Sequence, residues 1–328
     1  MSPEKTLSEL GERALIALID SVVGEPGVTL GIGDDTAALP TPGEGDLLAT
    51  TDSLVQDVHF NLAEGSGRRV GEKALAVNLS DIAAMGGTPR WALVSLIAPP
   101  ETPVAFVREL YLGLVSMARR FGVAIVGGNV SASPATLAVD VTLLGSAPSG
   151  QLVTRSGARL GDIIVVTGTL GRAAAERVLA VQGHEPGGTV SVPEPRISVG
   201  RSLAAAGLAH AMIDISDGLA TDIHHLVEAS SAGAVIYAAD VPIDIAARKV
   251  GRQTSQNPLN FALFGGEDYE LLFTMSEAQL PRAIEAAGDI PLAVIGTIVA
   301  PEYGVVLQDS GGVRTPLEAG GWEHFRRG

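Results

Sequence analysis

Between Gly145 and Gly161 the sequence loses its hydrophobic periodicity and becomes rich in Gly, Ser, Pro and Arg. Such a stretch is typical of the exposed junction between two domains. The chain has 328 residues, which is also more than the roughly 100–200 residues of a usual single domain. We therefore predict two domains, residues 1–149 and 150–328, with the boundary near Gly150.

Each half alternates apolar residues at helix spacing and at strand spacing. The first half predicts helices near 6–18, 73–85 and 107–121, and strands over 46–52, 91–98, 123–126 (ending in Gly127-Gly128) and 137–143. The second half predicts strands over 163–167, 211–215, 269–275 and 292–299, with helices after Gly171, Pro195 and Ser276 and at Asp217. The predicted fold class is therefore α/β (α+β), with mixed sheets covered by helices.

Charge and composition exclude several classes of function. Lys and Arg total 22 against 37 Asp and Glu, a formal net charge of -15, so a nucleic acid backbone would be repelled. The chain has no cysteine, which excludes disulfides, thiolate metal sites and cysteine nucleophiles. The N-terminus does not read as a secretory signal, and no apolar run approaches the ~20 residues that span a bilayer. We expect a cytoplasmic protein with no nucleic acid or membrane partner.

Five short motifs place carboxylates beside glycines or at strand ends. They are GIGDDTAAL (31–39), TTD (50–52), NLSD (78–81), IDISDGL (213–219) and FGGEDYEL (264–271). Taken singly, several have ordinary explanations, such as a solvated turn at Asp34-Asp35 or a helix N-cap at Asp217. Asp81 and Asp214 are harder to explain, because a carboxylate among apolar neighbours is costly to bury without a cation or a donor.

Divalent cations provide one common explanation for the five motifs. Asp and Thr oxygens without a dense His cluster favour Mg²⁺, which prefers carboxylates, waters and substrate phosphates. Gly127-Gly128-Asn129 and Gly168–Gly171 would supply backbone amides suited to phosphate oxygens. A Walker motif is missing, so the sequence does not predict an ordinary P-loop.

Taken in order, eight segments resemble the thiamine-monophosphate kinases, a family within the aminoimidazole ribonucleotide synthetase superfamily. The segments are GIGDD, TTDSLVQDVHF, KALAVNLSDIAAMGG, VGGN, TRSGARLGD, IDISDGL, GGEDYEL and the terminal GWEHF. The resemblance implies a two-domain synthetase-like fold and a homodimer joined through the N-terminal sheets. It also implies ATP-dependent, Mg²⁺-assisted phosphoryl transfer to the phosphate of thiamine monophosphate, which gives thiamine diphosphate and ADP. No general base is needed, because the acceptor is already an oxyanion.

The resemblance also assigns residues by position. The expected metal ligands, for several Mg²⁺ ions, are Asp35, Thr50, Thr51, Asp52, Asp81, Asn129, Asp214 and Asp217. The expected ATP contacts are Tyr111, Gly128, Asn129, Arg155 and Ser216, and the expected substrate contacts are His59, Glu267 and Trp322. From the residues alone, His59 is equally a solvated histidine, Tyr111 a packing residue on an amphipathic helix, and Trp322 a core or dimer aromatic.

Two positions depart from the family pattern, and two other functions compete. Asn129 stands where the family often has Asp, and Ala319 where some members carry an aromatic residue.

Other enzymes of the superfamily fit this sequence less well. The enzymes that make selenophosphate or mature hydrogenases rely on cysteine or selenocysteine, and aminoimidazole ribonucleotide synthetase lacks the substrate-end motifs. A catalytically silent binder of nucleotide or thiamine phosphate is the alternative from a different class.

Overall fold

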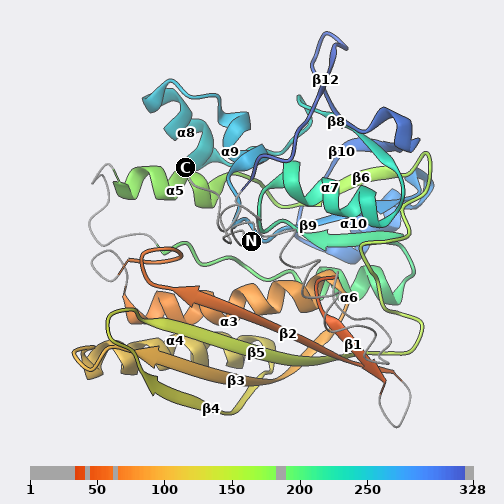
Figure 1. Ribbon diagram of the computed structural model, residues 1–328. Helices are drawn as coiled ribbons and strands as arrows, with labels where there is room; N and C mark the ends of the chain where they lie inside the picture. The colour runs from red at the N-terminus through yellow and green to blue at the C-terminus, as the bar shows by residue number, and fades with distance from the viewer. Residues whose placement is uncertain (1–33, 41–44, 62–65, 182–189, 322–328) are drawn as a thin grey trace, which may run out of the picture.

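The computed structural model describes residues 34–40, 45–61, 66–181 and 190–321. The predicted helix near residues 6–18 and Trp322 lie outside these residues. The described chain forms two mixed sheets, each covered by helices and stacked one above the other (Figure 1). The predicted α/β (α+β) class is confirmed.

The first sheet has five strands in the order β1-β2-β5-β3-β4. The strands are β1 (Ala37–Pro40), β2 (Asp46–Val55), β3 (Thr88–Ala98), β4 (Ala124–Ala132) and β5 (Ala138–Ala147). Only β3 and β4 are parallel; the other neighbours are antiparallel. Along β5, Val139, Val141 and Leu143 alternate with less buried residues, so one face of the sheet packs on helices.

The prediction that the fourth strand ends at Gly127-Gly128 is wrong. The strand β4 continues to Ala132, paired with β3 along its length. Gly128 allows this pairing, since a Cβ there would lie 1.8 Å from the Val94 carbonyl oxygen. The local sequence looks like a stop signal because glycine usually is one, but here it permits close approach of two backbones.

Two long helices, α3 (Gly67–Ala84) and α4 (Val104–Phe121), cover the inner face of this sheet. The helix α3 contacts β2 and β5 on one side and elements of the second domain on the other. After its first turn, which carries the exposed Arg68 and Arg69, α3 is buried on nearly all sides. The polar side chains further along the helix, Lys73, Asn78 and Ser80, therefore lie in the middle of the protein.

Glycines let α3 and α4 approach closely. A Cβ at Gly71 would lie 1.9 Å from the Leu110 carbonyl oxygen, and one at Gly113 would lie 1.9 Å from that of Arg68. We expect Gly71→Ala to destabilise the protein by about 2–3 kcal/mol, because two backbones must move apart. Urea unfolding measures the change. Gly127→Ala is the control, since its Cβ would meet only a Leu93 side-chain atom at 3.4 Å; equal midpoints for the two variants would contradict the prediction.

The second sheet has seven strands in the order β12-β11-β8-β10-β6-β9-β7. The strands are β6 (Ile163–Thr167), β7 (Ala211–Asp214), β8 (Gly233–Tyr237), β9 (Leu271–Met275), β10 (Leu292–Val299), β11 (Val305–Gln308) and β12 (Arg314–Pro316). The helices are α5 (Arg172–Val181), α6 (Ile197–Ala205), α7 (Leu219–Ala229), α8 (Ile245–Thr254), α9 (Pro258–Phe264) and α10 (Leu280–Ala287). Two 3₁₀ turns, Glu277–Gln279 and Pro301–Tyr303, complete the description.

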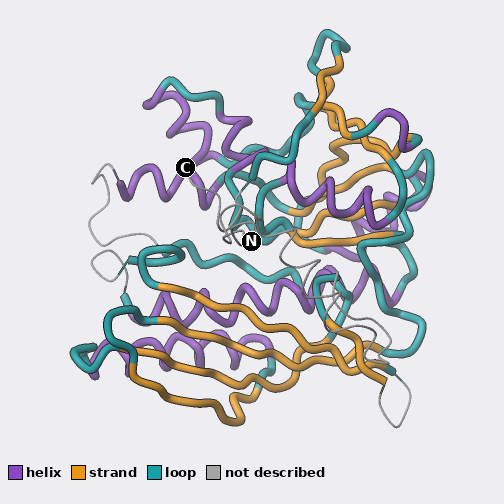
Figure 2. The backbone as a smooth tube through the Cα atoms, in the orientation of Figure 1, coloured by secondary structure: helices purple, strands orange, loops and turns teal. Residues whose placement is uncertain are grey.

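The strand β6 is buried on both faces and joins two cores. Ile163 and Val165 face a core that continues through α6 and α3 into the first sheet, while Ile164 and Val166 face a second core beneath α7. The first core therefore links both domains through packed side chains. Loops cross between the two layers of regular structure (Figure 2).

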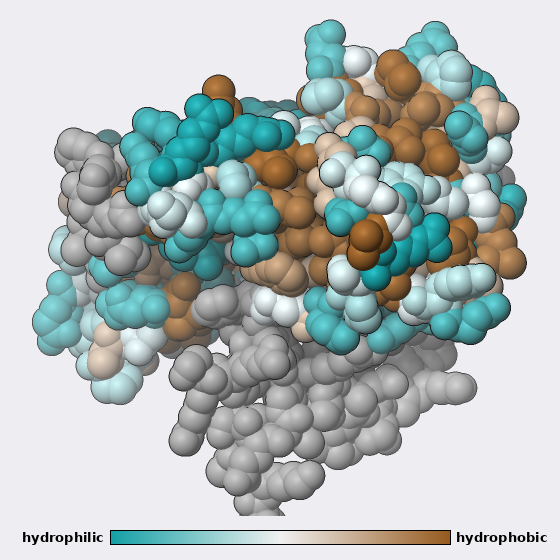
Figure 3. Space-filling view, turned by 90° about the horizontal axis from the view of Figure 1, so that it is seen from above, coloured by the Kyte–Doolittle hydropathy of each residue, from teal (hydrophilic) through white to brown (hydrophobic). Residues whose placement is uncertain are grey.

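The outer surface of the second domain, viewed from above, carries apolar side chains in its middle with hydrophilic ones to either side (Figure 3). Among the described residues, no helix is long and apolar enough to cross a membrane.

Candidate active site at the domain boundary

The buried helix α3 brings two polar side chains to the boundary between the domains. The Asp81 carboxylate accepts a hydrogen bond of 2.5 Å from the Thr50 hydroxyl of β2. The neighbouring Ser80 hydroxyl donates to Asp214, at the end of β7, over 2.5 Å. Three of the five acidic motifs thus meet through direct hydrogen bonds.

A fourth motif contributes Asp35, which lies close to Asp81 and Asp214 and also binds Arg155, in the segment between the two sheets. The Arg155 guanidinium donates to both Asp35 oxygens, at 2.8 and 3.1 Å. Its backbone N–H donates to Asp34 over 3.2 Å. Asp35, Asp81 and Asp214 each offer an oxygen within 4.8 Å of the others. The group of Asp35, Asp81 and Asp214 is hereafter the carboxylate cluster.

The carboxylates repel one another at this spacing. Burial, with the nearby charges of Asp52 and Asp214, raises the pKa of Asp81 well above its ordinary value. Burial and the Asp35 charge likewise raise the pKa of Asp214. Only one cation of the described residues, Arg155, touches the cluster, so negative charge remains in excess. Oxygen ligands with excess negative charge suit a hard divalent cation.

The raised pKa values predict how stability depends on pH in the absence of metal ions. Burial, with Asp35, raises the pKa of Asp34 to about 6, and burial raises that of Asp268 to about 7, although backbone N–H groups at Gly171 and Arg172 oppose the second shift. The folded state therefore binds more protons than the unfolded state above pH ~4. We expect the free energy of unfolding in chelator to fall as pH rises from 5 to 8. Urea midpoints at four pH values check this, and midpoints that rise across the range would refute it.

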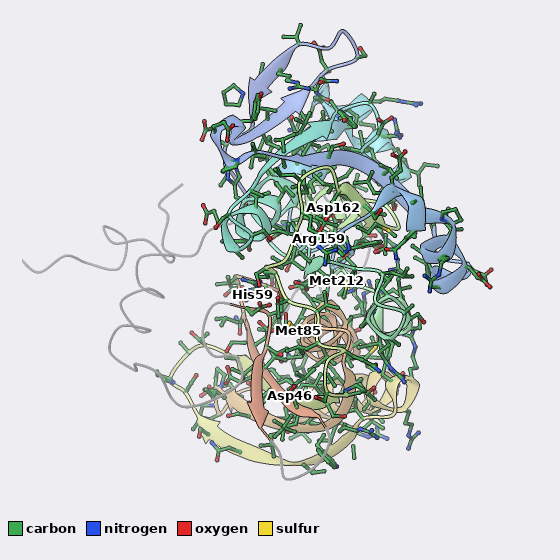
Figure 4. All side chains as sticks on the ribbon, turned by 90° about the vertical axis from the view of Figure 1, so that its right-hand side faces the viewer. Asp46, His59, Met85, Arg159, Asp162 and Met212 are labelled. Atoms are coloured by element: carbon green, nitrogen blue, oxygen red, sulfur yellow. The ribbon has the colours of Figure 1, made fainter. Side chains whose placement is uncertain are left out.

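A pocket of about 410 Å³ lies next to the cluster and is lined from both domains. Its lining residues include Thr51, Asp52, His59, Ser216, Asp217, Glu267 and Tyr269. A second pocket of about 200 Å³ shares His59 and Glu267 with it. Figure 4 labels His59 at the edge of the first domain, facing the second. The fold thus brings together two of the three residues expected to contact substrate.

The FGGEDYEL motif forms a tight turn that aims Glu267 at this pocket. Gly266 has a φ of +65°, and a Cβ there would lie 2.8 Å from the Ser216 carbonyl oxygen. Glu267 and Tyr269 also adopt positive φ values, 63° and 52°. Non-glycine residues rarely adopt this conformation, and it concentrates at functional sites.

Asp217 lines the pocket of about 410 Å³ but is not part of the carboxylate cluster. Its side chain comes within 4.8 Å of Asp222 and His225. The N-cap of α7 is Gly218, and the buried Asp222 accepts the N–H groups of Asp217 and Gly218. The explanation of Asp217 as a helix N-cap is therefore wrong.

Three residues expected to bind metal or nucleotide, Gly128, Asn129 and Tyr111, lie away from the carboxylate cluster of the same chain. Gly128 and Asn129 lie on the edge strand β4, separated from β2 by β5 and β3, roughly 14 Å at the usual strand spacing. The exposed Asn129 amide donates to the Ser131 hydroxyl at 3.0 Å. Tyr111 of α4 lines a separate groove of about 540 Å³, which also includes Val130 and Ser131 of β4.

Thr50 and Thr51 point to opposite sides of β2. Thr50 bonds Asp81 on α3, whereas the Thr51 hydroxyl lies 3.1 Å from the Thr142 hydroxyl on the neighbouring strand. Side chains alternate along a strand, so adjacent threonines cannot both face α3. Thr51 still borders the pocket of about 410 Å³.

Two cations at the pocket were missed by the sequence reasoning. Lys73 of α3 and Arg177 of α5 both bind the Glu267 carboxylate, at 2.5 and 2.9 Å. The available signal for Lys73 was its position at the start of the apolar run KALAVNLSD. Arg177 carries no comparable signal, because it lies on an ordinary amphipathic helix.

Comparison with known proteins agrees with this geometry. Residues 33–147 match the N-terminal domain of AIR synthase related proteins, and residues 159–308 match their C-terminal domain. The chain is therefore an AIR synthase related protein, with its candidate site at the boundary between the two domains.

Several relatives cover nearly the whole chain. The thiamine-monophosphate kinase of Bacillus subtilis is 36% identical over 91% of this chain and 94% of its own, and that of Aquifex aeolicus is 36% identical over 97% and 99%. The solved structure of AaThiL complexed with AMPPCP and TMP superposes with a TM-score of 0.85 at 34% identity, covering 98% of this chain and all of that one. The chain belongs to the thiamine-monophosphate kinase family of AIR synthase related proteins.

Proposed function

We propose that this protein is a thiamine-monophosphate kinase, which transfers a phosphoryl group from ATP to thiamine monophosphate and releases thiamine diphosphate and ADP. One observation carries the proposal beyond the family match: the carboxylate cluster and Arg155 lie beside a pocket of about 410 Å³ that both domains line. The solved relative that this chain superposes on is complexed with AMPPCP and TMP.

The proposed cofactor is Mg²⁺, held by Asp35, Asp81 and Asp214 with Thr50 and Asp52 beside them. The mutual repulsion of these carboxylates, and the hard oxygen donors, support this choice. When bound, Mg²⁺ supplies charge neutralisation for facing phosphates. Arg155 adds a fixed positive charge next to Asp35. The acceptor is a phosphate oxyanion, so no side chain has to remove a proton from it.

The proposed substrate contacts are His59 and Glu267, with Trp322 as a further aromatic contact. Ser216 and Asp217 line the same pocket and are proposed to face the nucleotide and its metal ions. Tyr111, Gly128 and Asn129 are proposed nucleotide or metal contacts on the β4 side of the first domain, where the groove of about 540 Å³ is largely apolar and suits a base.

We also propose a homodimer. The outer face of the first sheet exposes Trp91 and Leu93 of β3, at 47% and 42%. Described helices cover only the opposite face. An apolar sheet face of this kind usually marks an interface, and a second copy would cover it. Sedimentation velocity at several concentrations tests the dimer, and a monomer throughout would refute it. Cytoplasmic location follows from the proposed function and is part of the proposal.

The test of function is a coupled assay for thiamine diphosphate formed from thiamine monophosphate, ATP and Mg²⁺. Thiamine in place of its monophosphate, a mixture without ATP, and a mixture with chelator are the controls. Product only in the complete mixture is expected. Bound nucleotide without product would overturn the kinase and favour a silent binder or a sister enzyme.

A further inference from the structure

Lys73 has a buried ammonium group that contacts both domains. The residue is 1% exposed and is among the largest fully buried side chains of the described residues. Its Nζ donates to Glu267 of the second domain at 2.5 Å and to the backbone carbonyl of His59 at 3.2 Å. Burial of an ammonium group is costly, and a neutral residue of the same length would pack at least as well on this helix. Packing therefore does not explain Lys73.

Lys73 binds one group on each side of the pocket. His59 follows β2 in the first domain, and Glu267 belongs to the strained turn of the second. Both residues line the two adjoining pockets. The turn's backbone is anchored by Glu267 N–H to Ser216 and Tyr269 N–H to Ile215, but these bonds do not fix the direction of the Glu267 side chain.

Lys73 is the strong partner of Glu267, and Arg177 the weak one. The Lys73 side chain is 2% exposed, while that of Arg177 is 46% exposed. Water screens an exposed ion pair, so the Arg177 contact holds the carboxylate only loosely. Burial alone disfavours a charged Glu267, yet the Lys73 ammonium and Arg177 hold the pKa of Glu267 below its ordinary value. An ionised Glu267 suits a ligand with a cationic ring, as thiamine monophosphate has.

We propose that Lys73 is a positioning residue for substrate binding: its ammonium fixes the Glu267 carboxylate and the His59 backbone in one arrangement, so that both sides of the pocket meet thiamine monophosphate together. This inference rests on the proposed function. The helix α3 already carries Ser80 and Asp81 at the carboxylate cluster. The inference gives the same helix a second role, which is to position the substrate-binding residues.

The test separates substrate binding from nucleotide binding in steady-state kinetics. We expect Lys73→Met to lower kcat/KM for thiamine monophosphate by about 100-fold, mainly through KM, with KM for ATP changed less than about threefold. Arg68→Met is the matched control, because Arg68 lies on the same helix in an exposed pair with Glu109. It is expected to leave both KM values unchanged.

A double-mutant cycle distinguishes positioning from general destabilisation. In a Glu267→Gln background, adding Lys73→Met is expected to cost far less than the roughly 100-fold expected in the wild type, since only the contact of Lys73 with the His59 carbonyl is then lost. The double variant leaves neither charge buried alone, so it also serves if Lys73→Met by itself folds poorly.

Each outcome decides the inference. If the wild type is active, two results would overturn the inference and leave the proposed function intact. One is that Lys73→Met raises the KM for thiamine monophosphate and the KM for ATP equally; the other is that the effects of Lys73→Met and Glu267→Gln add fully in the cycle. A wild type that neither turns over nor binds thiamine monophosphate would overturn both.

Discussion

Asp81→Asn is expected to lower turnover about 1,000-fold and, in chelator, to make the protein more stable. Turnover falls because the amide weakens the oxygen cluster that we propose faces the transferring phosphate. Stability rises because the folded state holds Asp81 close to the charges of Asp52 and Asp214, and burial already raises its pKa. Removing one charge at pH 8 is worth roughly 1 kcal/mol or more, the equivalent of one pKa unit. Asn keeps an oxygen that can accept the Thr50 hydrogen bond.

Urea unfolding in chelator and the coupled assay measure the two effects on the same preparation. Asp289→Asn is the control, because Asp289 is exposed and lies in the second domain away from the cluster. Added Mg²⁺ is expected to stabilise the wild type more than the Asp81 variant. If Asp81→Asn lowers the metal-free midpoint, then the cluster is not held under repulsion, and the electrostatic argument fails.

Arg155→Met is expected to have the opposite effect on stability. The Arg155 side chain is 23% exposed, and its two hydrogen bonds reach an Asp35 side chain that is 1% exposed. Its loss leaves a buried carboxylate without a cation, which typically costs about 3 kcal/mol. The cost is expected to appear in chelator and to shrink when Mg²⁺ is added, because a bound divalent cation would replace the missing positive charge.

Arg159→Met serves as the control for that experiment, since Arg159 is an exposed residue of the same connecting segment. Denaturant midpoints are measured with and without Mg²⁺ for the wild type and for each of the two variants. An Arg155 variant as stable as the wild type in chelator would contradict the prediction. So would a loss of stability that Mg²⁺ does not reduce.

Local pattern was enough to find most of the core elements. The apolar run at 163–167 predicts β6 with its observed bounds, and the stripe at 107–121 predicts all of α4 except its first three residues. The elements β1, β8, α9, β11 and β12 were not predicted because each has seven residues or fewer and shows too little periodicity. The helix α8 was not predicted because half of its ten residues are polar. Gly127-Gly128 misled for a different reason, since the close approach of β3 and β4 depends on a partner distant in sequence.

The sequence by itself determined which residue types are available: an acidic chain without cysteine, with carboxylates set at the ends of apolar segments. These are properties of the chain and need no folding to be read. Only the tertiary structure decided which motifs share a site, because that depends on strand order and on the stacking of two domains around α3. It turned Thr50 towards Asp81 and Thr51 away, left Asn129 on an edge strand, and joined Lys73 to Glu267 across 194 positions of sequence. Hydrogen bonds and ion pairs act over a few ångströms in space, and sequence spacing does not measure that distance.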